Sequence, residues 1–208
     1  MSLSLLPADV LYLQRTCAVC ECYAGPLDGK WSLDVQTAEE KLAMMSAELS
    51  RTLGTFDART EKNISTLIIP AQRVAREFMQ ATRNFRLRVG VLSGTRTYAE
   101  QDALYAIGRT VQPKRGPVTK AKGGKSNHNF GIAWDIGLFD DSGRYLDGKK
   151  KGDDEAYKDL ASSVDLQLMG IEWGGNWRTF VDLPHYQLAT GRSADQVRAN
   201  FEAGKPLV

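Results

Sequence analysis

Histidine is scarce in this sequence: the chain of 208 residues has two. Cysteine is nearly as rare, and three cysteines cannot form a disulfide framework. No stretch approaches the ~18 apolar residues of a transmembrane helix, so we expect no membrane insertion. Charge of one sign is not in excess either, because 27 Lys and Arg against 25 Asp and Glu leave a net charge of +2. This balance argues against a dedicated nucleic-acid binder. A catalytic metal bound through imidazole would have to use both histidines.

The three cysteines all lie within residues 17–22. A structural zinc site uses four ligands, and the chain has no fourth cysteine and no histidine before His128. We therefore interpret the cluster as reduced, partly buried thiols beside a helix rather than as a metal knuckle. The N-terminus has no basic segment, and Pro7 and Asp9 interrupt its apolar residues. We predict that it is no signal peptide and that the protein is made in the cytoplasm.

Apolar spacing and capping residues predict the secondary structure. Apolar residues three and four apart, together with helix caps and breaks, mark helices over residues 8–24, 35–49, 70–79, 97–108, 153–169 and 193–203. Alternating residues mark a strand over 85–91, and shorter strands are expected at 132–136 and near 182–185. Because these elements do not follow regular βαβ spacing, we predict an α+β fold with a central antiparallel sheet and flanking helices.

The domain organisation is predicted from one charged stretch. Residues 51–62 carry charges and Gly54 but no apolar periodicity, so we expect a linker there. This prediction divides the chain into a small helical N-terminal segment, residues 1–56, and a main domain, residues 57–208.

Each histidine has a carboxylate nearby in the sequence. Asp135 follows His128 by seven residues, and Gly131 between them lets the backbone turn into a strand on which Asp135 can point back toward the imidazole. His185 follows Asp182 and a proline that excludes a helix interior. Two histidines and one aspartate would leave a coordination position open for water, as in a catalytic zinc site, with Asp182 as general base. The alternative is that both histidines are ordinary residues with incidental acidic neighbours, and the spacing alone does not decide.

The residues around both histidines resemble the M15 zinc peptidases, the family of D-alanyl-D-alanine carboxypeptidases, dipeptidases and phage L-alanyl-D-glutamate endolysins. The signature Ser-x-His-x-x-Gly-x-Ala-x-Asp is matched at every fixed position in residues 126–135, and the second signature, acid-x-x-His, stands at residues 182–185. Residues 93–110 and 172–177 are similar to the endolysin branch, as is the use of aspartate before the last histidine. The resemblance extends over about residues 64–205.

The resemblance implies an M15 peptidase-like catalytic domain with one Zn²⁺ per chain. The metal ligands would be His128, Asp135 and His185. Asp182 would act as the base, and Arg96 would stabilise the oxyanion that forms during peptide hydrolysis. The position of Arg96 fits this role, because a junction between a strand and a helix commonly presents a functional side chain.

Three further residues would contact substrate: Ser126, Gln101 and Trp173, although a place in the core is the alternative for Trp173. The implied function is hydrolysis of the peptide stem of peptidoglycan at the L-alanyl-D-glutamate bond, by a monomeric phage endolysin that reaches the wall after a membrane breach. A D-alanyl-D-alanine carboxypeptidase and an anti-bacterial effector exported by a dedicated machine are alternatives. The alternative that is not an enzyme is a non-catalytic, zinc-stabilised wall-binding protein. The presence of both Asp182 and Arg96 argues against this alternative.

The N-terminal segment resembles the small helical peptidoglycan-binding module. Residues 11–14 are similar to its first-helix signature, and residues 28–32 followed by Thr37 are similar to its Asp-Gly-x-aromatic-Gly…Thr turn. Ser32 stands where the module has glycine, and Thr37 comes about two residues late. The alternative is a helical extension of the catalytic domain without affinity for the wall.

Overall fold

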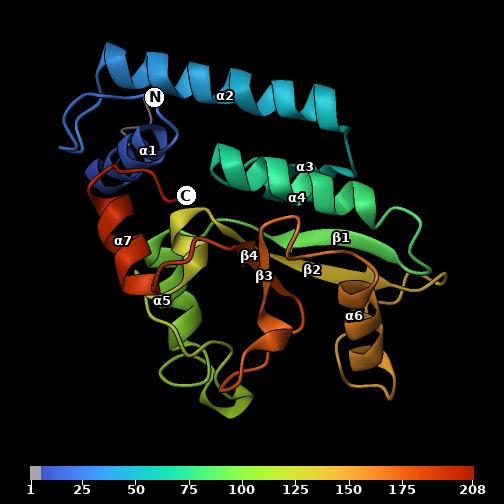
Figure 1. The fold of residues 1–208 in the computed structure, drawn as a ribbon. Coiled ribbons are helices and arrows are strands. Elements are labelled where there is room, and N and C mark those ends of the chain that lie inside the picture. The colour runs from blue at the N-terminus through green and yellow to red at the C-terminus, as the bar shows by residue number, and fades with distance from the viewer. Residues whose placement is uncertain (1–5) are drawn as a thin grey trace. The chain divides into compact units, whose positions relative to one another are not determined.

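The computed structural model describes residues 6–208 (Figure 1). These residues form seven α-helices and one four-stranded sheet, which confirms the predicted α+β class. In chain order the main elements are α1 (Pro7–Val19), α2 (Leu33–Leu53), α3 (Ala58–Ile64), α4 (Ile69–Ala81), β1 (Arg88–Ser93), α5 (Tyr98–Ala106), the short 3-10 helix η2 (Asn127–Phe130), β2 (Ala133–Phe139), α6 (Asp153–Ser162), β3 (Ile171–Trp173), the 3-10 helix η3 (Gly174–Asn176), β4 (His185–Leu188) and α7 (Ala194–Glu202). Residues 1–5, on which the signal-peptide prediction partly rests, lie outside the described part. Among the helices described, none has the length and apolar character needed to cross a membrane.

The contacts divide the chain into two compact units. The first, here called the sheet unit, consists of residues 46–95 and 132–189 and contains the whole sheet with α3, α4 and α6. The second, here called the terminal unit, consists of residues up to 45, 96–131 and those from 190 on, and contains α1, α5, η2 and α7. The predicted division into residues 1–56 and 57–208 stays a prediction.

The sheet has the strand order β1-β2-β4-β3, and every neighbouring pair is antiparallel. Asp135 of β2 lies opposite His185 of β4. Glu172 of β3 lies opposite Gln187, also of β4. Because side chains alternate along a strand, these four residues share one face, which we call the site face. The opposite face, here called the core face, carries large apolar and aromatic side chains: Trp134, Ile136, Trp173, Tyr186 and Leu188.

Helix α4 packs on the core face of the sheet (Figure 1). It starts where the sequence predicts, because Pro70 occupies its first turn, where a missing N–H costs nothing. Ala71, Ala75 and Phe78 recur on its buried side, and the Phe78 ring lies 4.7 Å from the ring of Tyr186. Burying such an aromatic side chain contributes roughly 1.5–3 kcal/mol to folding.

The expected linker over residues 51–62 is mostly helical, being occupied by the end of α2 and most of α3. The overlooked signal is Asp57, whose carboxylate accepts two hydrogen bonds from backbone N–H groups in the first turn of α3. The charges in this stretch are not simply solvated, since Glu61 accepts two hydrogen bonds from the guanidinium of Arg76, which is 1% exposed. A polar sequence here therefore stabilises packed helices.

The first strand starts later than its alternating sequence predicts. β1 begins at Arg88, whereas the alternation already runs from residue 85. Its partner strand β2 ends at Phe139, directly opposite Arg88. Residues 85–87 thus have the side-chain pattern of a strand but no neighbouring strand to pair with.

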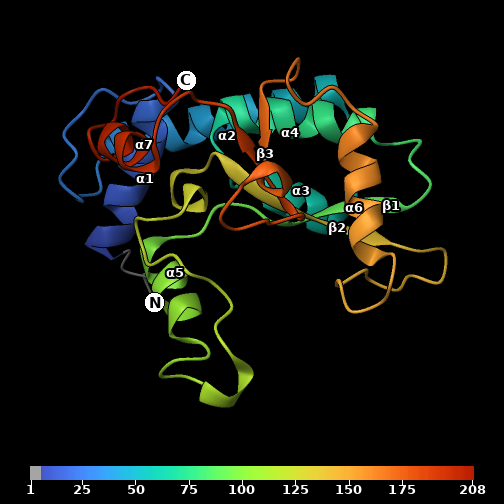
Figure 2. The ribbon, with the colours of Figure 1, turned by 60° about the horizontal axis from the view of Figure 1, so that its bottom comes forward.

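In the terminal unit, α1 and α7 lie side by side (Figures 1 and 2). The rings of Tyr12 from α1 and Phe130 from η2 both pack on Phe201 of α7, at centroid distances of 5.3 and 5.6 Å. Helix α5 opens with the predicted capping box of Thr97 and Glu100. These contacts hold η2 in a defined place within its unit.

The N-terminal turn that resembles a wall-binding module is tied to α1 by one buried glutamine. The amide of Gln14 donates to the Asp28 carboxylate at 3.1 Å and to the Lys30 carbonyl at 3.0 Å, and accepts from the Gly29 N–H at 2.9 Å. Gly29 has φ +71, and a Cβ there would lie 2.6 Å from the carbonyl oxygen of Pro7, so the turn requires glycine. The two parts of the resembling motif are therefore joined in the fold.

Candidate metal centre

The pairing of β2 with β4 brings two of the three predicted ligands, Asp135 and His185, together. Asp135 Oδ1 lies 3.3 Å from Nδ1 of His185, and the imidazole is buried, with 6% exposed. The Ile136 N–H donates to the carbonyl oxygen of Pro184 at 3.0 Å, which fixes the chain immediately before His185. The predicted proximity of this histidine to Asp135 thus follows from strand register.

The third predicted ligand, His128, is buried in η2. Its carbonyl oxygen accepts a hydrogen bond from the Arg96 N–H at 3.1 Å. The next residue, Asn129, is fully buried and donates from its side chain to the Arg96 carbonyl at 2.8 Å, while its side-chain oxygen accepts from the Gly124 N–H at 2.9 Å. Gly131 ends η2 with φ +69, the left-handed conformation that the turn into β2 requires.

His128, Asp135 and His185 together offer three ligand atoms, all within 4.8 Å of one another. No other group of at least three histidine, cysteine or acidic ligands is found within residues 6–208. Two nitrogens and one oxygen are a donor set typical of catalytic zinc, which keeps a fourth position open. Two donors on one tetrahedral zinc, with bonds of ~2.0–2.2 Å, lie roughly 3.3–3.6 Å apart. The 3.3 Å between Asp135 and His185 fits this geometry.

The second ring nitrogen of His185 also fits a metal ligand. Nε2 lies 2.9 Å from Oε1 of the buried Gln187. Metal-ligating histidines almost always donate their other N–H to such an acceptor, which fixes the ring and its tautomer. Residues 6–208 therefore contain a donor set that could hold a metal ion, and a supporting partner for one of its histidines.

The electrostatics of the metal-free site centre on His185. Burial lowers the pKa of its imidazole, but the hydrogen bond and charge of Asp135, the hydrogen bond to Gln187 and the charge of Asp182 raise it by more. The net result is a pKa above the usual value of histidine. The acidic neighbours thus favour positive charge at this position, and a metal cation would meet the same attraction.

Asp182, the predicted base, lies in the turn before β4. Its N–H donates to the Gly174 carbonyl at 3.0 Å, and its own carbonyl accepts from the His185 N–H at 3.2 Å. A Cβ at Gly174 would lie 2.6 Å from the Asp182 carbonyl oxygen and 3.1 Å from Cβ of His185, so only glycine fits under this turn. Asp182 is outside the three-ligand group but close enough for its charge to raise the pKa of His185.

Arg96 and Gln101 lie in the terminal unit and contact each other. The guanidinium of Arg96 donates to Oε1 of Gln101 at 3.2 Å. Gln101 is fully buried, and its amide nitrogen donates to the Ala121 carbonyl at 2.9 Å. Ser126 is half-buried just before η2. The roles of these residues at substrate stay predictions, although the Gln101 contacts are those of a residue that holds Arg96.

Two tryptophans lie near the site, on different faces of the sheet. Trp173 is on the core face, 9% exposed, with its indole N–H donating to the Leu183 carbonyl at 2.8 Å. This is the placement expected if Trp173 belongs to the core, which was the alternative to substrate contact. The ring that packs beside His185, at a centroid distance of 4.8 Å, belongs to Trp177.

Trp177, Gln187 and Glu172 are not among the predicted site residues, although Glu172 and Trp177 lie in the segment that resembles the endolysin branch. One signal could have found Gln187, because it follows His185 by two residues in a strand and so shares its face. The other two depend on the pairing of β3 with β4 and on the course of η3, which the sequence pattern does not reveal.

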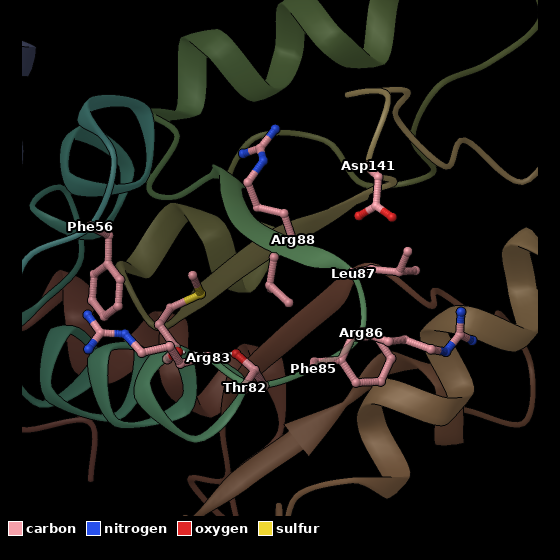
Figure 3. A pocket seen from close by; sticks show the side chains of 10 residues that line it. Phe56, Thr82, Arg83, Phe85, Arg86, Leu87, Arg88 and Asp141 are labelled. Carbon is pink, nitrogen blue, oxygen red and sulfur yellow. Dashed lines mark hydrogen bonds between the residues drawn. The ribbon is translucent and has the colours of Figure 1, made fainter.

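A separate cavity of about 380 Å³ opens elsewhere in the sheet unit (Figure 3). Arg83, Arg86, Arg88 and Asp141 are among the residues that line it. Arg86 already forms an ion pair with Asp159 at 2.7 Å, and the guanidinium of Arg88 lies over an aromatic ring of β2. None of the predicted site residues lines this cavity, and we assign it no role.

The arrangement is that of a possible metal site with two histidines and one aspartate, a donor set that hydrolytic metal enzymes use, and Asp182 lies in the turn before β4. Comparison with known families agrees. Residues 119–188 match a peptidase M15 family model described as D-alanyl-D-alanine carboxypeptidase. The matched segment contains the three predicted ligands and Asp182. This part of the chain is therefore similar to the M15 peptidase family.

Two individual proteins are similar to this chain. The peptidoglycan L-alanyl-D-glutamate endopeptidase CwlK of Bacillus subtilis (strain 168) is 37% identical over 110 residues, which are 52% of this chain and 65% of CwlK. The chain thus spans somewhat less than two thirds of that relative. The crystal structure of the L-Ala D-Glu endopeptidase ChiX of Serratia marcescens is 25% identical, with a TM-score of 0.44, and the match covers 64% of this chain and 88% of ChiX.

Proposed function

We propose that this protein is a zinc-dependent peptidase that hydrolyses the peptide stem of bacterial peptidoglycan at the L-alanyl-D-glutamate bond. The observation that carries the proposal is the convergence of His128, Asp135 and His185, with Asp182 in the turn before β4. The similarity to CwlK supports the choice of bond, because that relative is named for it. Cleavage of the terminal D-alanyl-D-alanine bond is the second candidate, favoured by the description of the matching family model.

The chain's residues would share the work of hydrolysis. His128, Asp135 and His185 would hold the zinc, which when bound supplies Lewis acidity toward the scissile carbonyl and an attacking water. Asp182 would accept the proton of that water as its oxygen bonds to the carbonyl carbon. When the C–N bond breaks, Asp182 would return the proton to the leaving amine nitrogen.

Arg96 would stabilise the negative charge that develops on the carbonyl oxygen. Its backbone is fixed on both sides, since its N–H donates to the His128 carbonyl and its carbonyl accepts from Asn129. The hydrogen bond to Gln101 restrains its guanidinium. A donor held in advance of the reaction is effective in this role, and removing one typically costs ~2.7–4 kcal/mol of barrier, roughly 100- to 1000-fold in rate.

Digestion of purified peptidoglycan by the zinc-loaded protein, with mass spectrometry of the products, tests this function. We expect new amino termini on D-glutamate and muramic acid that retains L-alanine alone. Release of terminal D-alanine without those products would favour the second candidate. Intact stems after digestion by the zinc-loaded protein would contradict both.

We further propose that the protein acts as a phage endolysin rather than as an exported effector. The similarity of residues 93–110 and 172–177 to the endolysin branch supports this setting. Production of the protein inside a bacterium should then leave the cells intact until the membrane is permeabilised, after which they should lyse. Lysis without permeabilisation would contradict the proposal.

A further inference from the structure

Four residues on and beside the site face form a closed set of contacts around one metal ligand. His185 Nε2 lies 2.9 Å from Oε1 of Gln187, whose amide nitrogen donates to Glu172 Oε2 at 3.1 Å. The other carboxylate oxygen of Glu172 accepts from the indole N–H of Trp177 at 2.6 Å. The Trp177 ring then packs back on the imidazole of His185. We call these residues the His185 circuit.

The hydrogen bonds of this circuit allow only one assignment of donors and acceptors. An indole N–H can only donate, and an ionised carboxylate can only accept. Glu172 therefore accepts from both neighbours, so Gln187 must turn its NH₂ group toward Glu172 and its carbonyl oxygen toward His185. That oxygen requires a proton on Nε2. In the neutral imidazole, the lone pair is then left on Nδ1, the nitrogen that faces Asp135.

We propose that Glu172 is a positioning residue that acts through Gln187 to hold His185 in the tautomer and orientation needed to bind zinc through Nδ1. The proposal rests on the metal-binding part of the proposed function. It assigns the role to a carboxylate that lies outside the ligand group and outside the catalytic pair of Asp182 and Arg96.

The position of Glu172 allows the positioning role to be distinguished from a contribution to folding. Glu172 lies on β3, an edge strand of the sheet, and its side chain is exposed. An exposed side chain at such a position contributes little packing, and surface substitutions usually change stability by less than ~0.5 kcal/mol. A substitution of Glu172 should therefore alter the tautomer and orientation of His185 with little effect on the stability of the fold.

The test replaces Glu172 by Gln, which keeps the size of the side chain but removes its fixed acceptor character. Glu155→Gln is the matched control, because Glu155 is an exposed glutamate of the same unit that pairs with Lys158 at a distance of 2.8 Å. We expect zinc affinity, measured by competition with a chelator, to fall about 10- to 100-fold in Glu172→Gln, as is usual when such an outer partner is lost. The control should bind zinc like the unaltered protein.

A second readout needs no metal. The chain has two histidines, so ¹⁵N-detected NMR of the metal-free protein, at a pH where the rings are neutral, gives two imidazole patterns. His185 should carry its proton on Nε2 in the unaltered protein and in the control, and should become a mixture of tautomers in Glu172→Gln. Trp177→Phe, which keeps the ring beside His185 but loses the N–H, should show a smaller shift in the same direction. This variant also serves if Glu172→Gln does not fold.

The outcomes distinguish this proposal from the proposed function. Zinc affinity within twofold of the unaltered protein, together with an unchanged tautomer in Glu172→Gln, would overturn the positioning role. If the unaltered protein binds no zinc, the metal centre itself is wrong, and the tautomer measurement alone decides whether Glu172 orders His185.

Discussion

The two faces of the sheet are built from alternate residues of the same strands, yet they differ in what their side chains do. On β4, Tyr186 and Leu188 pack into the core, while His185 and Gln187 face the site. The polar groups of the site face have polar partners. On the core face, Trp134 Nε1 and Tyr186 Oη are buried with no hydrogen-bond partner among residues 6–208. Packing dominates one face and polar contacts the other.

This comparison shows what the site depends on most. A slip of one residue in the pairing of β2 with β4 would exchange the two faces, because side chains alternate with a period of two. The core face, held by Phe78 and its neighbours, therefore fixes the register that places Asp135 opposite His185. Changes to the site face should affect metal binding and catalysis, and changes to the core face should affect the stability of the fold.

The largest effect on the site face is expected from His185→Ala. The chain has no spare histidine, so the variant should lose zinc binding and all hydrolysis of peptidoglycan above background. The fold should remain, since the core face is untouched. Zinc content by mass spectrometry and circular dichroism of the same sample check both expectations. An active variant would contradict the ligand assignment.

Asp182→Asn should separate catalysis from metal binding. Asp182 is outside the ligand group, so the variant should keep its zinc, while loss of the proton acceptor should lower kcat by ~10²- to 10⁴-fold. The variant should keep the two backbone hydrogen bonds of the turn, from the Asp182 N–H to Gly174 and from the His185 N–H to the Asp182 carbonyl. Kinetics on a soluble stem peptide test this, and near-normal kcat would exclude Asp182 as the base.

On the core face, Phe78→Ala should show the opposite pattern. Phe78 is fully buried against Tyr186, and truncating such a residue typically destabilises a protein by ~3–5 kcal/mol. Zinc affinity and activity per folded molecule should change little at temperatures well below unfolding. Chemical denaturation followed by an activity assay measures both. Loss of activity without loss of stability would break the distinction between the faces.

The pH dependence of the metal-free protein tests the electrostatics of the site face. The folded-state pKa of His185 is raised, chiefly by Asp135 acting against burial, so protonation favours the folded state. This stabilisation is full below the unfolded pKa of ~6.5 and is lost as pH rises through the higher folded-state pKa. Melting curves in a chelator from acid to mildly alkaline pH should show this loss, and Asp135→Asn should reduce it. The same pH dependence of the melting temperature in the unaltered protein and in Asp135→Asn would contradict the assignment of the raised His185 pKa to Asp135.

The smallest effect is expected from Tyr186→Phe on the core face. The Tyr186 hydroxyl is buried without a partner among the described residues, and burial raises its pKa. Removing an unsatisfied hydroxyl while keeping the ring should leave stability unchanged or raise it by up to ~1 kcal/mol. Chemical denaturation checks the sign. A clear loss of stability would mean that the hydroxyl has a partner, such as an ordered water.

The sequence predicted features that depend on neighbours along the chain better than features that depend on strand pairing. Short-range signals were sufficient for α4, for the capping box of α5 and for the motif around His128, because each depends on neighbours in the chain. The start of β1 was missed because it depends on where β2 ends. The His185 circuit was missed because Glu172 meets Gln187 only through the pairing of β3 with β4.

The central claim is that His128, Asp135 and His185 hold one zinc ion in this fold. Crystals of the zinc-loaded protein, measured on both sides of the zinc absorption edge, test it most directly. We predict a single anomalous peak within bonding distance of all three side chains, with His185 bound through Nδ1. A peak at other residues, or no peak from zinc-saturated protein, would contradict the account.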